Sequence, residues 1–304
     1  MVFIKKVQSG SKTYYYLVQS YRIGGTVQQK VIKRLTSTET NDPNFIKSFL
    51  GKNPGFQRSG IKAIILAAGK SLRLFPYSQE LPKGLIPVGN KPILRHAIDS
   101  LHTCGINEII LVTGFQHRKM KETFKNEVKY LHNPFYSVSN ILASVWFAIQ
   151  EMTSSIFVLY SDILFPKSII NRLIQSDNDI SVAITSTIID NEAEKVVIQD
   201  DYLVEIGKEI PYGSTSYEFA GIAKFSKKGT QHLQKALEEM AQEEGFLDLY
   251  FTTVLERLLL QGHKINTITT SADLWIDIDF PKDLQRAETD ILPNLKLHEP
   301  DEIL

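Results

Sequence analysis

The stretch AIILAAGKSLRLFPYSQELPKGLIPVGNKPIL, residues 63–94, constrains this chain more than any other segment. It begins as an apolar run typical of a buried strand, and it continues as a long loop that carries Lys70, Arg73 and Lys83. In open α/β sheets, ligands bind beyond the carboxyl ends of the strands. The stretch therefore predicts an α/β sheet with a site for a negatively charged ligand at the end of this strand.

The pattern after Ile61 supports this interpretation. Strand-like segments at 62–68, 107–114, 155–162 and 180–188 alternate with helix-like segments at 91–105, 116–127, 140–152 and 166–176. Such alternation predicts a mostly parallel, twisted sheet with helices on both faces, which is a Rossmann-like arrangement. Residues 194–225 are richer in β-formers and predict a group of antiparallel strands. Two helices, a strand at 263–270 and a last helix from Pro281 follow.

The first segment is different, and it predicts a small N-terminal antiparallel β meander. Residues 1–38 alternate β-formers with polar residues and break at Gly10 and at Gly24–Gly25. We expect three units: the basic meander at 1–38, a linker at 39–59, and an α/β domain at 60–304. The segment contains seven cations and no acid before Glu39. With its tyrosines at 14, 15, 16 and 21 it could form a nucleic-acid surface.

This first segment resembles the N-terminal β region of certain insertion-sequence transposases, but no catalytic motif of theirs follows it. The resemblance and the pattern together favour a fused addition over a working DNA-binding module.

Bulk properties exclude several classes of protein. The formal net charge is zero, so no overall field draws the chain to nucleic acid or membrane. Cys104 is the only cysteine, which excludes internal disulfides and cysteine-cluster metal sites and suits a reducing compartment. No apolar run is long enough to span a bilayer, and the N-terminus lacks the apolar core of a signal peptide. A cytoplasmic location is expected.

The loop after the first α/β strand has the residue types that bind phosphate. The small residues Ala67, Ala68 and Gly69 let a ligand approach the backbone, whose free N–H groups can cradle phosphate oxygens. Arg73 offers a bidentate fork, and Lys83 offers a mobile point charge. The spacing is neither that of a P-loop nor that of a dinucleotide fingerprint.

The whole string resembles the signature of nucleotide-diphospho-sugar-type nucleotidyltransferases, LAAGxGxRLxPxTxxxPKxLxxVxxKPIL. Ser71 stands in place of the second glycine, and neither this exchange nor Ser78 for threonine removes a charge. The resemblance implies an α/β domain that binds a nucleoside triphosphate and Mg²⁺, with a phosphate-bearing substrate attacking the α-phosphate. It implies Arg73 and Lys83 as catalytic residues. The nucleotide-binding residues that it implies in this loop are Leu66, Ala67, Ala68, Gly69, Lys70, Ser71, Arg73 and Lys83.

Phosphoryl chemistry of this kind also needs carboxylates that hold a metal ion. Asp162 lies just past a core strand, where an ionised side chain is otherwise costly. Asp277 and Asp279 are two residues apart and share one face if the backbone is extended. The family's metal-binding aspartates occupy the corresponding positions, so Asp162 and Asp279 are the expected principal ligands, with Asp277 in support. For Asp279 the alternative is an N-cap of the last helix.

The middle of the chain favours one branch of the family. The segment NPFYSVSNILASVWFA resembles that of cytidylyltransferases that act on phosphocholine or 2-aminoethylphosphonate. Asn140 and Ser144 match it, while Ile141 replaces a second asparagine. The resemblance places these residues beside the base and ribose of CTP, with Asn133 and Tyr136 nearby.

A second matching segment contains Lys208 and Glu218, and Tyr217 stands where glycine is usual. A small cationic acceptor needs cations for its phosphate, which Lys83 and Lys208 would supply, and carboxylates or aromatic faces for its amine. The expected substrate-binding residues are Asn133, Tyr136, Lys208, Tyr217, Glu218 and Trp275.

The leading hypothesis is therefore a Mg²⁺-dependent cytidylyltransferase that transfers CMP from CTP to a small phosphate or phosphonate and releases pyrophosphate. The first alternative is a sugar-1-phosphate nucleotidylyltransferase that uses UTP or dTTP. A more distant alternative is a nucleotide- or DNA-binding regulator that uses the basic first segment. The second substrate and the oligomeric state, including a homodimer, stay open at this point.

Overall fold

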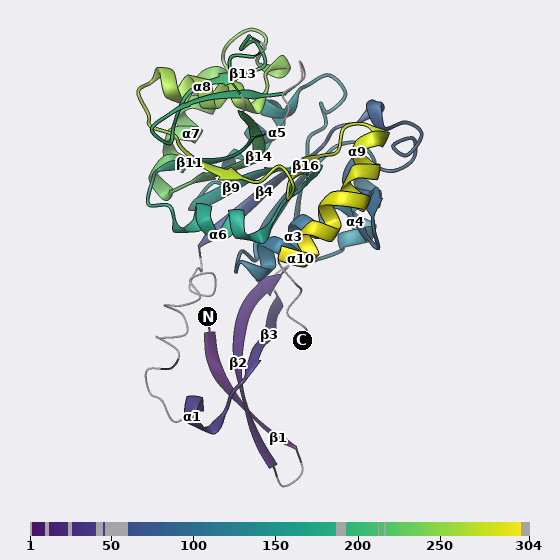
Figure 1. The fold of residues 1–304 in the computed structure, drawn as a ribbon, viewed down its shortest axis with the longest axis vertical. Coiled ribbons are helices and arrows are strands. Elements are labelled where there is room, and N and C mark those ends of the chain that lie inside the picture. Colours follow the sequence, from purple (N-terminus) through teal and green to yellow (C-terminus); the bar gives the residue numbers. More distant parts are fainter. Residues whose placement is uncertain are drawn as a thin grey trace.

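The N-terminal strands form a sheet of their own. The computed structural model describes residues 2–9, 12–23, 26–40, 45, 60–186, 193–211, 213–215 and 217–298. Within them, β1 (Val2–Ser9), β2 (Lys12–Ile23) and β3 (Thr26–Arg34) pair antiparallel in the order β1-β2-β3, which confirms the predicted meander. Figure 1 shows this sheet beside the larger α/β body.

The expected boundary at residue 38 falls inside a short helix, α1 (Ser37–Thr40). The predicted linker lies mostly outside the described residues, at 41–44 and 46–59. The division into three units stays a prediction.

Nine strands of the described part form the main sheet, in the order β11-β15-β13-β12-β14-β9-β4-β7-β8. Its parallel half contains β9 (Ser155–Tyr160), β4 (Ile61–Ala67), β7 (Glu108–Thr113) and β8 (Lys129–His132). The other half is largely antiparallel and contains the antiparallel strands predicted in residues 194–225. Its strands are β11 (Ile180–Ser186), β12 (Lys195–Gln199), β13 (Tyr202–Gly207), β14 (Tyr217–Phe225) and β15 (Asn266–Thr270).

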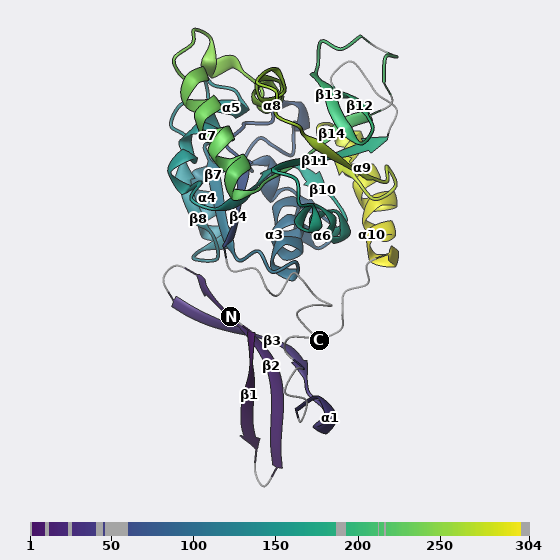
Figure 2. The ribbon, with the colours of Figure 1, turned by 90° about the vertical axis from the view of Figure 1, so that its left-hand side faces the viewer.

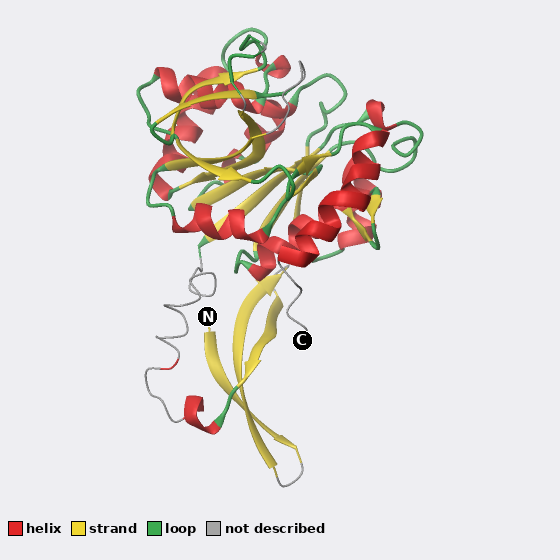
Figure 3. Cartoon of the chain, viewed as in Figure 1, coloured by secondary structure: helices red, strands yellow, loops and turns green. Residues whose placement is uncertain are grey.

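Helices cover both faces of the main sheet, as the alternating pattern predicted (Figures 2 and 3). The reason is visible in β4, where every side chain from Ala63 to Ala67 is buried and successive residues point to opposite faces. Ile64 and Leu66 belong to one apolar cluster, and Ile65 belongs to the other. A strand buried on both faces needs a helical layer on each side.

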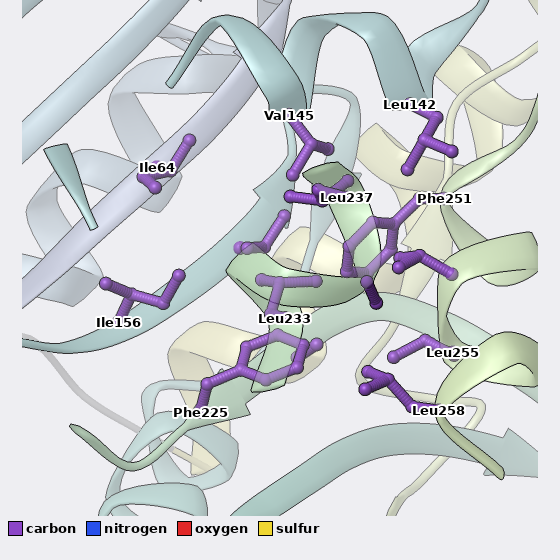
Figure 4. Packing of buried hydrophobic residues seen from close by; sticks show 14 of the residues in the cluster. Ile64, Leu142, Val145, Ile156, Phe225, Leu233, Leu237, Phe251, Leu255 and Leu258 are labelled. Atoms are coloured by element: carbon purple, nitrogen blue, oxygen red, sulfur yellow. The ribbon is translucent and has the colours of Figure 1, made fainter. Parts of the chain in front are cut away.

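The Ile64 side is packed by α5 (Ile141–Phe147), α7 (Lys227–Met240) and α8 (Phe251–Leu260). Figure 4 shows Phe251, Leu255 and Leu258 of α8 packed near Leu233 and Leu237 of α7. The Ile65 side is packed by α3 (Ile93–Thr103), α4 (His117–Phe124) and α6 (Lys167–Gln175). The fold is therefore a three-layer α/β sandwich.

The last residues of the described chain build a third apolar cluster beside this sandwich. It joins α9 (Pro281–Arg286), a π-helical turn (Ala287–Ile291) and α10 (Leu292–His298) to the loop that follows β4. In that loop lie two 3₁₀ turns, Leu72–Leu74 and Lys83–Leu85, and the strand pair β5 (Pro87–Val88) and β6 (Lys91–Pro92). Two other 3₁₀ turns are Ile149–Glu151 and Phe246–Asp248.

One short pairing decides the geometry of the site. The two-residue strands β10 (Ile163–Leu164) and β16 (Ile276–Asp277) pair antiparallel, with Ile163 opposite Asp277. The backbone N–H of Ile278 also donates to the carbonyl of Asp162 at 3.1 Å. This pairing brings the end of β9 against the segment that precedes the last helices. Within the described ranges, the helices are too short or too polar to cross a membrane.

Candidate active site

Three aspartates converge on one lysine where β9 ends. Lys83 opens a 3₁₀ turn after Pro82, and its side chain is only 5% exposed. Its Nζ lies 2.8 Å from Oδ2 of Asp162, 2.6 Å from Oδ1 of Asp279 and 3.5 Å from Oδ1 of Asp277. The structure thus brings together the predicted lysine and all three predicted carboxylates.

Charge and burial act against each other in this cluster. Burial would lower the pKa of the Lys83 ammonium, but the negative charges of Asp162, Asp277 and Asp279 outweigh burial and raise that pKa above its ordinary value. Burial also raises the pKa of Asp277 well above its usual range. At Asp279 burial acts in the same direction, but Lys83 outweighs it and lowers the pKa. Lys83 is therefore a fixed positive charge at the centre of the cluster.

The donor set fits a divalent cation. One carboxylate oxygen from each of Asp162, Asp277 and Asp279 lies within 4.8 Å of the others. Oδ1 of Asp162 is buried and makes no hydrogen bond within the described residues. Oδ1 of Asp277 is also buried without a hydrogen bond there, and the Lys83 ammonium lies 3.5 Å from it. A buried carboxylate oxygen without a hydrogen-bond donor is costly unless a cation takes that place. Oxygen donors in this number are what Mg²⁺ uses when phosphates and water complete its coordination.

Asp279 is not the N-cap of the last helix, because Phe280 occupies that position. Asp283 accepts hydrogen bonds from the backbone N–H of Phe280 at 2.7 Å and of Asp279 at 3.1 Å. The carboxylate of Asp279 instead contacts Lys83 and, at 3.4 Å, Nη1 of Arg73. Because Asp283 serves the start of α9, the Asp279 carboxylate points to the cluster.

A cavity of about 220 Å³ lies on the Asp162 side of the cluster. Asp162, Lys83 and the loop after β4 line it. The predicted nucleotide-binding residues that line it are Leu66, Ala67, Ala68, Gly69, Ser71, Lys83, Asn140 and Ser144. The remaining two do not line it: Nη1 of Arg73 lies 3.4 Å from Oδ2 of Asp279, and the Lys70 ammonium lies 5.8 Å from the centre of the Tyr136 ring.

Two glycines of this region have different structural roles. A Cβ atom on Gly69 would meet nothing within 4 Å, so the fold itself does not require glycine there. A Cβ atom on Gly114 would come within 2.4 Å of Tyr136 Cβ and 2.6 Å of the Ala68 carbonyl oxygen. Gly114 therefore permits the close packing of the loop against Tyr136, whereas Gly69 leaves open space in front of the loop.

Ser71 has a left-handed backbone, with φ of 51° and ψ of 52°. Glycine adopts this conformation without steric cost. The fold thus explains why the signature has glycine at this position.

The predicted substrate-binding residues do not all lie in one place. Asn133 and Tyr136 line the first cavity with the nucleotide loop. Asn133 is fully buried, and its Nδ2 donates to the hydroxyls of Ser139 at 3.2 Å and Ser144 at 3.1 Å. Asn140 caps α5 through its side-chain oxygen, which accepts from the N–H of Ile141 at 2.8 Å. These contacts fix the wall of the first cavity.

A second cavity, of about 250 Å³, lies on the other side of the cluster and is lined by Asp277 and Asp279. Of the predicted substrate-binding residues, Glu218 and Trp275 line it. The indole N–H of Trp275 donates to the carbonyl of Ala220 at 3.0 Å, which holds the ring in place. The two cavities therefore flank the Lys83–aspartate cluster.

Lys208 and Tyr217 do not line the second cavity. The Lys208 ammonium lies 4.5 Å from the centre of the Tyr250 ring, and Tyr217 packs against the apolar cluster of α7 and α8. Because Tyr217 and Glu218 are neighbours on a strand, their side chains point to opposite faces. This alternation places Glu218 in the cavity and Tyr217 against the core.

Sequence reasoning missed Glu194, a second glutamate of this cavity. Its carboxylate accepts hydrogen bonds from the hydroxyls of Tyr160 at 2.8 Å and Thr252 at 3.1 Å. Burial raises the pKa of Glu194, and it raises the pKa of Tyr160 well above its usual range. The one signal available was Tyr160 itself, a polar ring two residues before Asp162.

The comparisons with known proteins agree with this geometry. Residues 63–209 match the MobA-like NTP transferase domain, and residues 4–53 match the N-terminal domain of IS1634 family transposases. The second match confirms the resemblance of the first segment.

Three curated relatives cover most of the α/β part of the chain. The chain is 24% identical over 249 residues to CTP:phosphoglutamine cytidylyltransferase of Campylobacter jejuni, covering 74% of this chain and 98% of that protein. It is 26% identical to CMP-5'-(3-aminopropyl)phosphonate synthase of Streptomyces rubellomurinus, over 75% of this chain and 38% of the relative. It is 28% identical to the bifunctional protein GlmU of Methanococcus aeolicus, over 77% of this chain and 55% of the relative.

Among solved structures, the CTP:phosphocholine cytidylyltransferase of Streptococcus pneumoniae superposes with a TM-score of 0.67 at 22% identity. The superposition covers 76% of this chain and 98% of that one, and it confirms the predicted fold class. Residues 63–209 therefore resemble the MobA-like NTP transferase domain, and the chain is a nucleotidyltransferase.

Proposed function

We propose that the protein transfers CMP from CTP to a small phosphate or phosphonate that carries an amine, and that it releases pyrophosphate. The observation that carries this proposal is the position of the Lys83–aspartate cluster between two cavities. One cavity has the glycine loop and suits a nucleotide. The other has two glutamates and suits the cationic end of an acceptor.

The reaction needs alignment and charge rather than a covalent intermediate. An oxygen of the acceptor phosphate attacks the α-phosphorus of CTP, and the bond between the α-phosphorus and the bridging oxygen breaks, so that pyrophosphate leaves. Lys83 would contribute a fixed positive charge beside the reacting phosphates. Arg73, which contacts Asp279 of the cluster, would bind phosphate oxygens through its guanidinium fork.

Asp162, Asp277 and Asp279 would hold Mg²⁺ in this proposal. A divalent cation there would neutralise phosphate charge and orient the triphosphate. The carboxylates would fix its position, and Lys83 would limit the net negative charge of the cluster when the metal is absent.

The second cavity favours an amine over a neutral sugar. Glu194 and Glu218 line it together with the ring of Trp275, and carboxylates with an aromatic face are what an ammonium group requires. The relatives named for phosphoglutamine and aminopropylphosphonate support this branch. The similarity to GlmU keeps a sugar 1-phosphate as the second candidate.

A substrate panel tests the proposal. Pyrophosphate release is measured with CTP, UTP, ATP or GTP against phosphocholine, 2-aminoethylphosphonate and glucose 1-phosphate. We expect activity with CTP and an amine-bearing acceptor. Ethylphosphonate, which lacks the amine, is the matched control and should have a higher KM than 2-aminoethylphosphonate. Activity with glucose 1-phosphate alone would contradict the proposal.

A further inference from the structure

The N-terminal sheet has a charge that the transfer reaction does not use. Residues 1–38 contain seven lysines and arginines and no acid. Because the whole chain has a formal net charge of zero, residues 39–304 carry a formal net charge of −7. The positive charge is thus concentrated in one three-stranded sheet.

The strand register places some of these cations beside tyrosines. Lys5 of β1 lies opposite Tyr16 of β2, and Tyr16 lies opposite Arg34 of β3. Two residues along, Val7 lies opposite Tyr14. Cross-strand partners and residues two apart share one face of a sheet. We call this surface, made of Lys5, Val7, Tyr14, Tyr16, Val31 and Arg34, the tyrosine face.

The tyrosine face is accessible in the described structure. Lys5 and Arg34 are exposed, Val7 and Val31 are 36% and 46% exposed, and Tyr14 and Tyr16 are half-buried. Val18, which lies two residues from Tyr16 and opposite Val31, is buried. The Arg34 guanidinium lies 4.4 Å from the centre of the Tyr14 ring, and Lys5 donates to the side chain of Gln29 at 2.8 Å. Both contacts are with uncharged groups, so neither neutralises a cation.

The opposite face of the sheet differs. Leu17 is fully buried there, and its cross-strand partner Lys33 forms an ion pair with Glu39 of α1 at 2.7 Å. The exposed Lys6 also lies on that face, opposite Tyr15. Both faces therefore carry cations beside tyrosines, and the tyrosine face is the one where a guanidinium lies over a tyrosine ring.

We propose that the tyrosine face binds single-stranded nucleic acid. Cations bind the phosphate backbone, and aromatic rings stack on the bases, which is the combination that single-strand binding surfaces use. A guanidinium that lies over a tyrosine ring directs its N–H groups outward in its own plane, where phosphate oxygens can accept from them.

Other occupants fit this surface less well. A second copy of the sheet would bring seven like charges against seven, which opposes self-association. An acidic protein surface would satisfy the cations but would not use the half-buried tyrosine rings. The register therefore changes the interpretation from sequence alone, which favoured a passive addition.

Fluorescence anisotropy with a labelled oligothymidine of about 20 nucleotides tests the proposal on the full chain. We expect binding at low salt, with an affinity that falls as salt rises. The double variant Lys5→Glu/Arg34→Glu should weaken binding by about tenfold or more, with a smaller salt slope. The matched control Lys125→Glu/Lys235→Glu changes the same charge at exposed sites of the α/β part and should bind as the original chain does.

The tyrosines are tested separately, since the charge variants could disturb the sheet. Tyr14→Phe/Tyr16→Phe keeps the rings and should retain binding, whereas Tyr14→Leu/Tyr16→Leu should lose it, with circular dichroism to check that both variants fold. Absence of binding at low salt would overturn the proposal. So would equal binding by the charge variant and its control, displacement of the oligonucleotide by CTP, or equally strong competition by polyglutamate.

Discussion

At the scale of single residues, Lys83 is the centre of the candidate site. Its ammonium lies within 3.5 Å of an oxygen from each of three aspartates that come from two distant parts of the chain. The identities of these four residues could be predicted from sequence, because a lysine after proline and carboxylates after strands are local signals. Glu194 could not, since its role depends on two hydroxyl donors that only the fold brings to it.

Two glycine substitutions separate ligand binding from packing. Gly69→Ala adds a methyl group to open space in the nucleotide cavity, so we expect unchanged stability and a KM for CTP raised by about tenfold. Gly114→Ala forces a Cβ atom against Tyr136 and should lower the free energy of unfolding by about 1–3 kcal/mol. Urea denaturation and CTP kinetics on both variants check this, and a stability loss in Gly69→Ala would count against the assignment.

Glu194 is expected to act on the acceptor and not on the nucleotide. Tyr160 and Thr252 donate to different oxygens of Glu194, so Glu194→Gln keeps an acceptor for one of them and removes the charge, and the KM for an amine-bearing acceptor should rise by about tenfold. The KM for CTP should not change. Steady-state kinetics with each substrate varied in turn measure both effects, with the exposed Glu256→Gln as control. Equal changes in both KM values would show that Glu194 does not select the acceptor.

At the scale of elements, long periodic segments were predictable and short pairings were not. An apolar run predicts β4, because a strand that is buried on both faces has apolar residues at every position. A helical repeat of apolar residues predicts α3, because that helix is buried on one face. The β10–β16 pairing involves two residues from each strand and has no periodic signal. This pairing nevertheless sets Asp162 beside Asp277, so these carboxylates could be identified from sequence but their positions could not.

Helix α3 contains two histidines whose protonation should lower the free energy of unfolding. Burial is the main reason why the pKa values of His96 and His102 are lowered in the folded state. The unfolded chain then binds protons more readily as the pH falls below about 6.5, so acid should destabilise the fold. We expect a lower urea midpoint at pH 5.5 than at pH 7.5. The variant His96→Asn/His102→Asn should show a smaller difference, and an unchanged difference would refute this contribution.

At the scale of the whole molecule, the chain combines a nucleotidyltransferase sandwich with a separate basic sheet. The two sheets share no strand, and both cavities of the candidate site are lined by residues between Leu66 and Arg286. The sequence indicated this organisation through the abrupt change in charge and period near residue 60. What sequence could not provide was the register that gathers Lys5, Tyr16 and Arg34 in one row.

Removal of residues 1–59 should therefore leave the transfer reaction intact. Within the described residues the cavities and the aspartate cluster lie entirely in the remaining part, so kcat and both KM values should stay within about twofold of the full chain. Steady-state kinetics on the purified shortened chain check this. A folded but inactive shortened chain would show that the first sheet contributes to catalysis.

The most direct test of the central claim is pyrophosphate release by Asp162→Asn, compared with Asp290→Asn, an exposed aspartate outside both cavities. With CTP, Mg²⁺ and the acceptor that the panel identifies, Asp162→Asn should remain folded and lose at least about 100-fold in kcat/KM. Asp290→Asn should keep full activity. An Asp162→Asn variant as active as the original chain would contradict a metal–triphosphate site at this cluster.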